Sequence, residues 1–156
     1  MEIKPRAIGA AFGILLLAPA SPSQAAGPFQ FHSVTPCRLV DTRNAAPEGP
    51  ILQSGVERTI VVQGLCGIPV GAAAVAVNIT AVSPTNQGRL TLYPTGITPP
   101  TTSNLNFPPG TFALNNGAIV PLADQAVEPN DLAVMPFVVN NGQVHMVLDV
   151  TGFFAP

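Results

Sequence analysis

The segment VTPCRLVDTR, residues 34–43, gathers three charged side chains and one of the two cysteines of a chain in which only 9% of residues are charged. If the segment is a strand, its side chains alternate between two faces, so Asp41 shares a face with Cys37 while Arg38 points the other way. Burying an isolated carboxylate is costly. Asp41 is therefore expected to pair with a neighbouring cation.

Arg43, Arg58 and Arg89 are the cations that neighbouring segments could bring to Asp41. A planar guanidinium can hold a carboxylate through two parallel hydrogen bonds. We interpret Arg38, Asp41 and Arg43 as a structural ion-pair node at the end of a strand, and a cluster that contacts a ligand is the alternative.

Catalytic chemistry finds little support in the rest of the chain. The only histidines are His32 and His145, and the sequence contains no GxSxG segment of the kind that serine hydrolases use. His145 and Asp149 resemble a dyad, but four residues along one strand separate them by about 13 Å, beyond hydrogen-bond reach. No catalytic residue is predicted, and a hydrolase is the least favoured function.

Metal-binding patterns are equally scarce. Two cysteines without histidines at ligand spacing cannot form a closed zinc site. Asp124, Glu128 and Asp131 lie in the loop ADQAVEPND, whose spacing matches no standard calcium loop. We expect a solvated acidic loop there, with calcium binding as the alternative, and predict neither a metal site nor a cofactor.

The first 26 residues have the layout of a secretory signal peptide, with Lys4 and Arg6, an apolar run over residues 7–18, and small residues up to Ala26. The run is shorter than the roughly 20 apolar residues of a membrane span, so none is expected once the signal is removed. The protein is thus expected to be secreted or held at the cell surface, with one domain over residues 27–156.

Export would carry Cys37 and Cys66 into an oxidising compartment, where an even number of cysteines favours a disulfide between them. Two buried free thiols are the alternative. Without the signal, four arginines stand against seven acidic residues and no basic stripe remains. This balance argues against nucleic acid and anionic membrane surfaces as partners.

Short β-rich runs recur about every 10 residues between clusters of Gly, Pro and Asn, which is typical of an all-β sandwich or barrel. We predict a single antiparallel β-sandwich, jelly-roll-like or immunoglobulin-like, with strands at residues 29–33, 37–42, 57–63, 73–82, 89–93, 103–107, 111–114, 118–122, 132–139 and 143–151. Asn115-Asn116-Gly117 and Asn140-Asn141-Gly142 are each predicted to form a hairpin turn, because Asn and Gly tolerate positive φ.

Strand parity separates the faces of two of these runs. In residues 143–151 the core face consists of Val144, Met146, Leu148 and Val150. In residues 73–82 both faces are apolar or small, which predicts a central strand or a strand whose second face another subunit covers. A homo-oligomer is therefore a candidate assembly.

Four landmarks together resemble a bacterial extracellular domain that recurs in secreted and surface-attached proteins. They are FHSVTPCRLVDTR, the segment that begins CGIPVG, then SNLNF and HMVLDVTGFF, and the resemblance runs in order from about Phe29 to Phe154. The resemblance implies that Cys37 pairs with Cys66, and it implies no established activity or catalytic residues. Gly152-Phe153-Phe154 departs from the Gly-Tyr-Phe ending that is common in that family.

These observations favour a non-enzymatic secreted or cell-surface domain with a structural, adhesive or assembly role and an unidentified extracellular partner. A carbohydrate-binding module is the alternative, with Tyr93, Asn104 and Asn106 as candidate ligand contacts in a groove. Sugar platforms usually rely on exposed aromatic rings, whereas this chain has no Trp and only one Tyr.

Overall fold

A computed structural model describes residues 28–156, so the predicted signal peptide over residues 1–26 lies outside the described residues. Nine strands and one short 3-10 turn make up this part of the chain. In order they are β1 (Gln30–Asp41), β2 (Leu52–Gln53), β3 (Arg58–Ile60), β4 (Ala74–Val82), β5 (Gly88–Pro94), β6 (Leu105–Phe107), β7 (Ala113–Pro121), β8 (Leu132–Val138), η1 (Val139–Asn141) and β9 (Gln143–Ala155). The predicted all-β class is confirmed.

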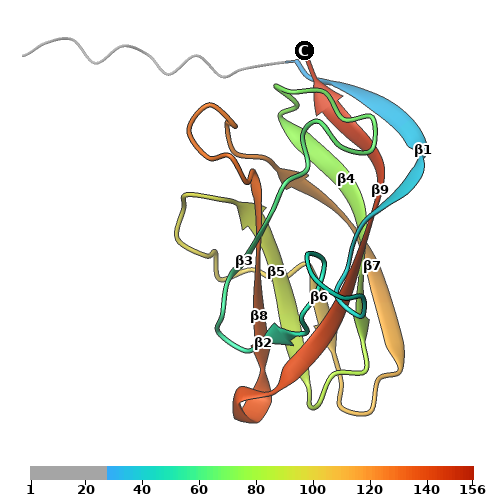
Figure 1. Cartoon of the computed structure of the whole chain (residues 1–156), viewed down its shortest axis with the longest axis vertical. Coiled ribbons are helices and arrows are strands. Elements are labelled where there is room, and N and C mark those ends of the chain that lie inside the picture. Colours follow the sequence, from blue (N-terminus) through green and yellow to red (C-terminus); the bar gives the residue numbers. More distant parts are fainter. Residues whose placement is uncertain (1–27) are drawn as a thin grey trace, which may run out of the picture.

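The strands form two antiparallel sheets that pack face to face (Figure 1). The five-stranded sheet has the order β1-β9-β4-β7, with the short β2 also paired to β9, and the four-stranded sheet has the order β3-β8-β5-β6. With β2 set aside, this order is that of a jelly roll. The structure thus confirms the predicted sandwich and selects the jelly roll over the immunoglobulin-like arrangement.

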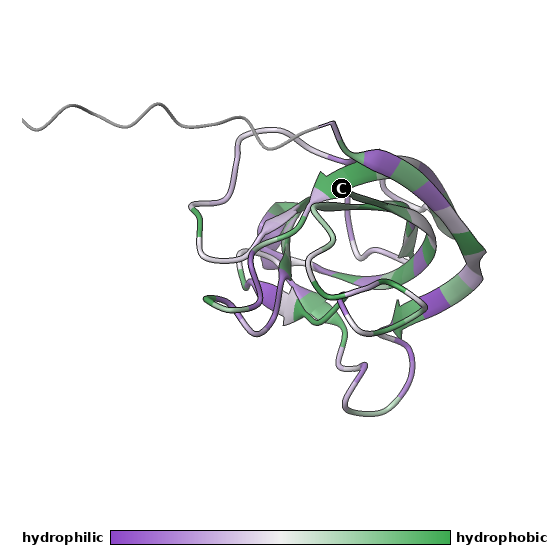
Figure 2. Ribbon diagram, turned by 90° about the horizontal axis from the view of Figure 1, so that it is seen from above, coloured by the Kyte–Doolittle hydropathy of each residue, from purple (hydrophilic) through white to green (hydrophobic). Residues whose placement is uncertain are grey.

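The hydrophobic core lies between the two sheets. Seen from above, the strands curve around a common interior, and hydrophobic and hydrophilic residues alternate along them (Figure 2). On β9, the predicted core face of Val144, Met146, Leu148 and Val150 is fully buried. The parity prediction is therefore correct for these four residues, although Val147 on the opposite face is also buried.

Strand β4 occupies the interior of the five-stranded sheet, between β9 and β7, as predicted for a strand with two apolar or small faces. Val75, Val77 and Ile79 are buried in the core, and the alternating small residues of the other face are half-buried. Small outward side chains leave this sheet face smooth.

The hairpin predicted at Asn115-Asn116-Gly117 is wrong. Strand β7 runs straight through the three residues and pairs with β4 at nine successive positions, from Val82 opposite Ala113 to Ala74 opposite Pro121. Asn and Gly permit a tight turn but do not require one, and the continuous ladder with β4 satisfies the backbone of this segment instead.

A turn does form at Asn140-Asn141-Gly142, and Asn140 and Asn141 have positive φ values of 59° and 53°. The strands that it joins belong to different sheets, however, because β8 pairs with β3 and β5 whereas β9 pairs with β1 and β4. The predicted hairpin is therefore a corner that takes the chain from one layer to the other.

The two ends of the described chain lie together. Gln30 pairs with Ala155 at the start of the β1–β9 ladder, so the beginning of β1 and the C-terminus sit at the same end of the sandwich (Figure 1). At an edge of the four-stranded sheet, β6 forms within the predicted range 103–107, as expected from the proline-rich segments around it.

Candidate functional site

The charged segment of β1 does not keep the simple alternation of a regular strand. The β1–β9 register shifts between Ser33 and Cys37 and again between Arg38 and Val40. A bulge places an extra residue on one strand and changes which face the following side chains occupy. As a result Arg38 reaches toward Asp41, and the prediction that they lie on opposite faces is wrong.

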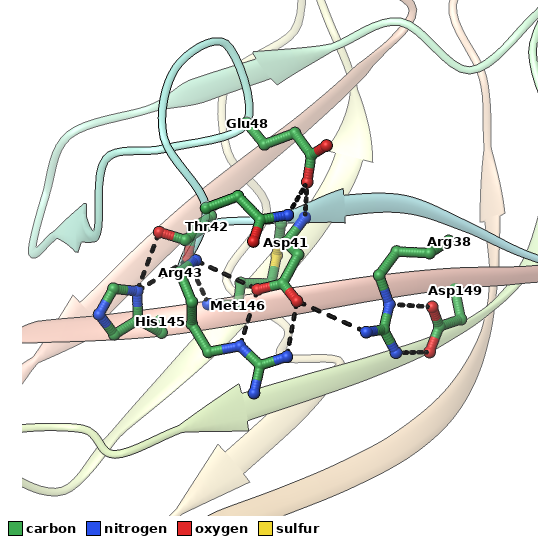
Figure 3. A network of polar contacts seen from close by, with 9 residues as sticks. Arg38, Asp41, Thr42, Arg43, Glu48, His145, Met146 and Asp149 are labelled. Carbon is green, nitrogen blue, oxygen red and sulfur yellow. Dashed lines mark hydrogen bonds and ion pairs between the residues drawn. The ribbon is translucent and has the colours of Figure 1, made fainter.

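Asp41 is the centre of a polar network shown in Figure 3. Its side chain is 7% exposed, and Arg43 donates to it from Nε to Oδ1 at 2.8 Å and from Nη2 to Oδ2 at 2.6 Å. The backbone N–H of Arg43 also donates to Oδ1 at 3.1 Å, and Arg38 Nη1 lies 3.5 Å from Oδ2. Asp41 is therefore buried and paired with an arginine, as the sequence predicted.

These contacts change the acidity of Asp41. The guanidinium hydrogen bonds from Arg43 lower the pKa of the carboxyl to about 2, against the opposing effect of burial, and the Arg43 backbone N–H adds to the lowering. The carboxylate is thus ionised across the neutral and mildly acidic range and holds the chain turn that follows β1.

Glu48 belongs to the same network, although nothing in its sequence spacing pointed to it. Its Oε2 accepts the backbone N–H of Asp41 at 3.0 Å and the side-chain amide of Asn44 at 2.9 Å. Arg58 then donates to the backbone carbonyls of Glu48 and Pro50, both at 3.0 Å. The loop between β1 and β2 is therefore tied to the end of β1 and the start of β3.

Arg38 makes its stronger contact across the ladder with β9. Its Nε lies 2.8 Å from Asp149 Oδ1 and its Nη2 lies 3.2 Å from Oδ2, so the guanidinium holds the carboxylate with two bonds (Figure 3). The hydrogen bond to Asp149 raises the pKa of Arg38 above its ordinary value. Arg38 thereby clamps the bulged part of β1 to β9.

The two histidines have separate environments. His145 Nδ1 donates to the carbonyl of Thr42 at 3.1 Å and lies 3.2 Å from the Thr42 hydroxyl. His32 stacks on Phe153 with ring centroids 4.9 Å apart. Within residues 28–156 neither histidine is hydrogen-bonded to a carboxylate, and Asp149 pairs with Arg38 instead of His145.

Cys37 and Cys66 form a disulfide with Cα atoms 5.7 Å apart, which confirms the predicted pairing. Cys37 lies in β1, at the edge of the five-stranded sheet, and Cys66 lies in the loop after β3, which is an edge strand of the other sheet. The bond therefore joins the two layers on the same side of the sandwich as the Asp41 network.

Tyr93, Asn104 and Asn106 do not form one open groove. Tyr93 is 2% exposed and its hydroxyl donates to Glu57, so its ring offers no platform to a ligand. Asn104 Oδ1 accepts the backbone N–H of Leu92 at 2.6 Å, which gives it a structural role beside β5. Asn106 alone is exposed, on β6.

The sequence did not predict a second buried carboxylate, that of Asp131. Asp131 was expected in a solvated acidic loop, but it is fully buried, and its oxygens accept the backbone N–H groups of Val62 at 2.7 Å and Gln63 at 2.9 Å. Its position directly before the apolar strand β8 was the available signal. Within residues 28–156 no three His, Cys, Asp or Glu side chains gather closely enough to hold a metal ion.

The polar groups of this region serve mainly to hold strands and loops. The Asp41 network and the disulfide both bind β1 to its surroundings, and Asp131 binds the segment that follows β3 to the start of β8. Residues 28–156 contain no helix with the length and hydropathy needed to cross a membrane.

Comparisons with known proteins give little further guidance. No protein-family model matches the chain, and no curated protein matches it. Among solved structures, a chain described as "Cyanophage Pam1 capsid asymmetric unit" is 14% identical with a TM-score of 0.41, covering 90% of this chain and 94% of that chain. A similarity at this level carries no argument about function.

Proposed function

We propose that this protein is a non-enzymatic structural and adhesive domain that acts outside the cell and assembles with a second copy of itself through the free edge of β7. The disulfide and the signal-like N-terminal sequence support export. The main support for self-assembly is the difference between the two edge strands of the five-stranded sheet, β1 and β7.

Strand β1 is an edge that is protected against pairing with another strand. Its ladder is interrupted by two register shifts, and it carries Pro36 and the charged Arg38. Bulges, prolines and charges are the usual means by which proteins prevent edge strands from associating.

Strand β7 has little of this protection. Its nine residues pair with β4 without a register shift, contain no charge, and include proline only at the last position, Pro121. Most of its residues are exposed, with Ile119 at 63%. Among the described residues its backbone bonds only to β4, and its one hydrogen bond to the other sheet runs from the Asn116 side chain to the Asn104 carbonyl at 2.7 Å.

An exposed, regular and uncharged edge is a template for another strand. A second copy offers the same edge, and antiparallel pairing of two identical strands about a two-fold axis gives a closed dimer in which both edges are satisfied. The outward faces of β4 and β7 would then continue across the two copies as one sheet surface.

Sedimentation of the exported, purified protein tests this proposal. The wild-type protein should form a dimer in a concentration-dependent manner, and Ile119→Lys should be monomeric because it places a charge beside the pairing edge. Val127→Lys is the matched control, since Val127 is 74% exposed but lies in the loop before β8. This control should associate like the wild type.

Two results would contradict the proposal. One is a wild-type protein that stays monomeric at every concentration measured, and the other is an Ile119→Lys variant that still dimerises. Thermal unfolding of both variants shows whether they remain folded, and protease treatment of intact cells tests the outward location separately.

A further inference from the structure

A shallow hollow of about 250 Å³ lies over β8, β5 and β6 on the outward face of the four-stranded sheet. Arg89 on β5 pairs with Phe137 on β8 and with Asn106 on β6, so these three residues form a row across the sheet. All three are exposed, whereas their neighbours Leu90 and Phe107 are buried in the core. The row therefore presents three different side chains to the solvent, close enough together to contact one small molecule.

Arg89 differs from the other arginines that the structure describes. Arg38 and Arg43 are bound to aspartates, and Arg58 is bound to two backbone carbonyls. Within residues 28–156, the Arg89 side chain has neither an ion-pair partner nor a hydrogen bond; its guanidinium carbon instead lies 4.6 Å from the centroid of the Phe137 ring.

The contact with the Phe137 ring restrains the Arg89 guanidinium, whose N–H groups have no hydrogen-bond acceptor within residues 28–156. The ring attracts the cation through its negative face, and it limits the rotations that a free arginine side chain would explore. A pre-oriented guanidinium loses less entropy when it forms two bonds to an anion. The charge of Arg89 is therefore placed for bidentate recognition of an oxyanion.

Amide groups flank this cation. Asn106 donates from Nδ2 to the Ser103 hydroxyl at 2.9 Å, which fixes the amide and leaves Oδ1 as an acceptor. Gln87 is exposed at the rim, and its backbone is fixed by a bond from Val139 N to Gln87 O at 3.0 Å. These amides can accept and donate hydrogen bonds to hydroxyl groups.

The floor of the hollow is rigid. At Gly88 a Cβ atom would clash with the carbonyl of Phe137 and press on the Phe107 ring, so β5 and β8 approach closely at this point. Sites on paired strands hold their geometry better than sites on loops.

We propose that this hollow binds an acidic saccharide, a sugar ring that carries a carboxylate. The Arg89 guanidinium would take the carboxylate through two parallel bonds, and the Asn106 and Gln87 amides would take the ring hydroxyls. This site is on the four-stranded sheet, whereas β7 belongs to the other sheet. The proposed saccharide binding therefore does not depend on dimerisation.

Backbone NMR titration of the folded protein tests the site. Galacturonate oligomers should shift the amide signals of Arg89, Asn106 and Phe137, whereas the neutral galactose oligomers should not. Arg89→Gln should weaken galacturonate binding about 10- to 100-fold, since it removes hydrogen bonds to a charged group. Phe137→Leu should weaken binding less, because the guanidinium remains but is no longer held.

Asn115→Ala, an exposed asparagine on β7, is the control and should bind like the wild type. Unchanged thermal unfolding of Arg89→Gln would show that its loss of binding is not a loss of folding. Equal binding of neutral and acidic oligomers, shifts confined to other parts of the molecule, or inorganic phosphate that binds as tightly as galacturonate would each overturn the proposal.

Discussion

Arg43 donates two hydrogen bonds to the carboxylate of Asp41, from Nε to Oδ1 at 2.8 Å and from Nη2 to Oδ2 at 2.6 Å, although the two residues are only two positions apart. The backbone N–H of Arg43 joins the same carboxylate, so the side-chain pair also closes a local turn at the end of β1. The pair therefore fixes the direction in which the chain leaves the sheet.

Replacing Asp41 with Ala should destabilise the fold by about 2 kcal/mol, because a buried acceptor is lost and Arg43 loses its partner, whereas Arg38 keeps Asp149. The cost stays below that of a fully buried pair, since the side chains of Arg38 and Arg43 are 51% and 48% exposed. Urea unfolding measures the change. Asp149→Asn, whose partner is the half-exposed Arg38, should cost less than about 1 kcal/mol; equal costs would contradict this ranking.

Acid should remove the contribution of Asp41. Its folded pKa of about 2 lies below the value of about 3.9 expected in the unfolded chain, so the stabilisation is present above pH 4 and is lost as the pH falls toward 2. The difference in unfolding free energy between the wild type and Asp41→Asn should therefore shrink by roughly 2 kcal/mol over that interval. A difference that does not change with pH would show that Asp41 is not ionised in this pair.

Tyr93 can be titrated alone, because it is the only tyrosine and the chain has no tryptophan. Burial, and then the hydrogen bond to Glu57, raise the pKa of its phenol above the ordinary value. The near-ultraviolet absorbance of phenolate should thus appear at higher pH in the folded protein than in the unfolded protein, and stability should fall as the pH rises above about 10. Glu57→Gln should lower this pKa only partly, since burial remains.

Asp131→Asn should cost about 2 to 3 kcal/mol, because an amide NH₂ would face one of the two backbone N–H groups that the carboxylate now accepts. Hydrogen exchange should speed up at Val62 and Gln63. Asp124→Asn is the control: it keeps the acceptor for Ala126 N–H and should change stability by less than about 0.5 kcal/mol.

Removing the disulfide with Cys37→Ser and Cys66→Ser together should lower the unfolding free energy by about 3 to 4 kcal/mol in the chain-entropy account, given a sequence separation of 29. Chemical denaturation of the double variant and of the reduced wild type should give similar losses. A much smaller loss would mean that the unfolded chain stays compact without the bond.

The sequence predicted well those features that depend on period alone. Burial of Val144, Met146, Leu148 and Val150 follows from alternation along one regular strand, and the central place of β4 follows from its two-sided pattern. A fold built from two buried sheet faces leaves such a pattern in any strand that pairs regularly.

The alternation rule gave the wrong faces where the β1–β9 ladder is irregular. The bulge between Arg38 and Val40 brings Arg38 toward Asp41, and a bulge depends on contacts with β9 that no local pattern records. The hairpin prediction at Asn115-Asn116-Gly117 was wrong for a related reason. These residue types permit a turn, but the segment pairs with β4 and remains extended. Glu48 acts through the conformation of its loop and had no local signature, whereas Asp131 had only its place before β8, because its partners Val62 and Gln63 are distant in sequence.

The adjacency of the two ends of the described residues, Gln30 and Ala155, also determines how the domain carries mechanical load. Tension applied at Gln30 and Ala155 unzips the β1–β9 ladder from one end. The backbone hydrogen bonds then break one pair at a time and are not sheared together. Peeling of β1 stops at Cys37, where the covalent bond to Cys66 transfers the force to the other layer. Residues 38–65, which include Asp41, Arg43 and Glu48, are thereby kept out of the line of tension.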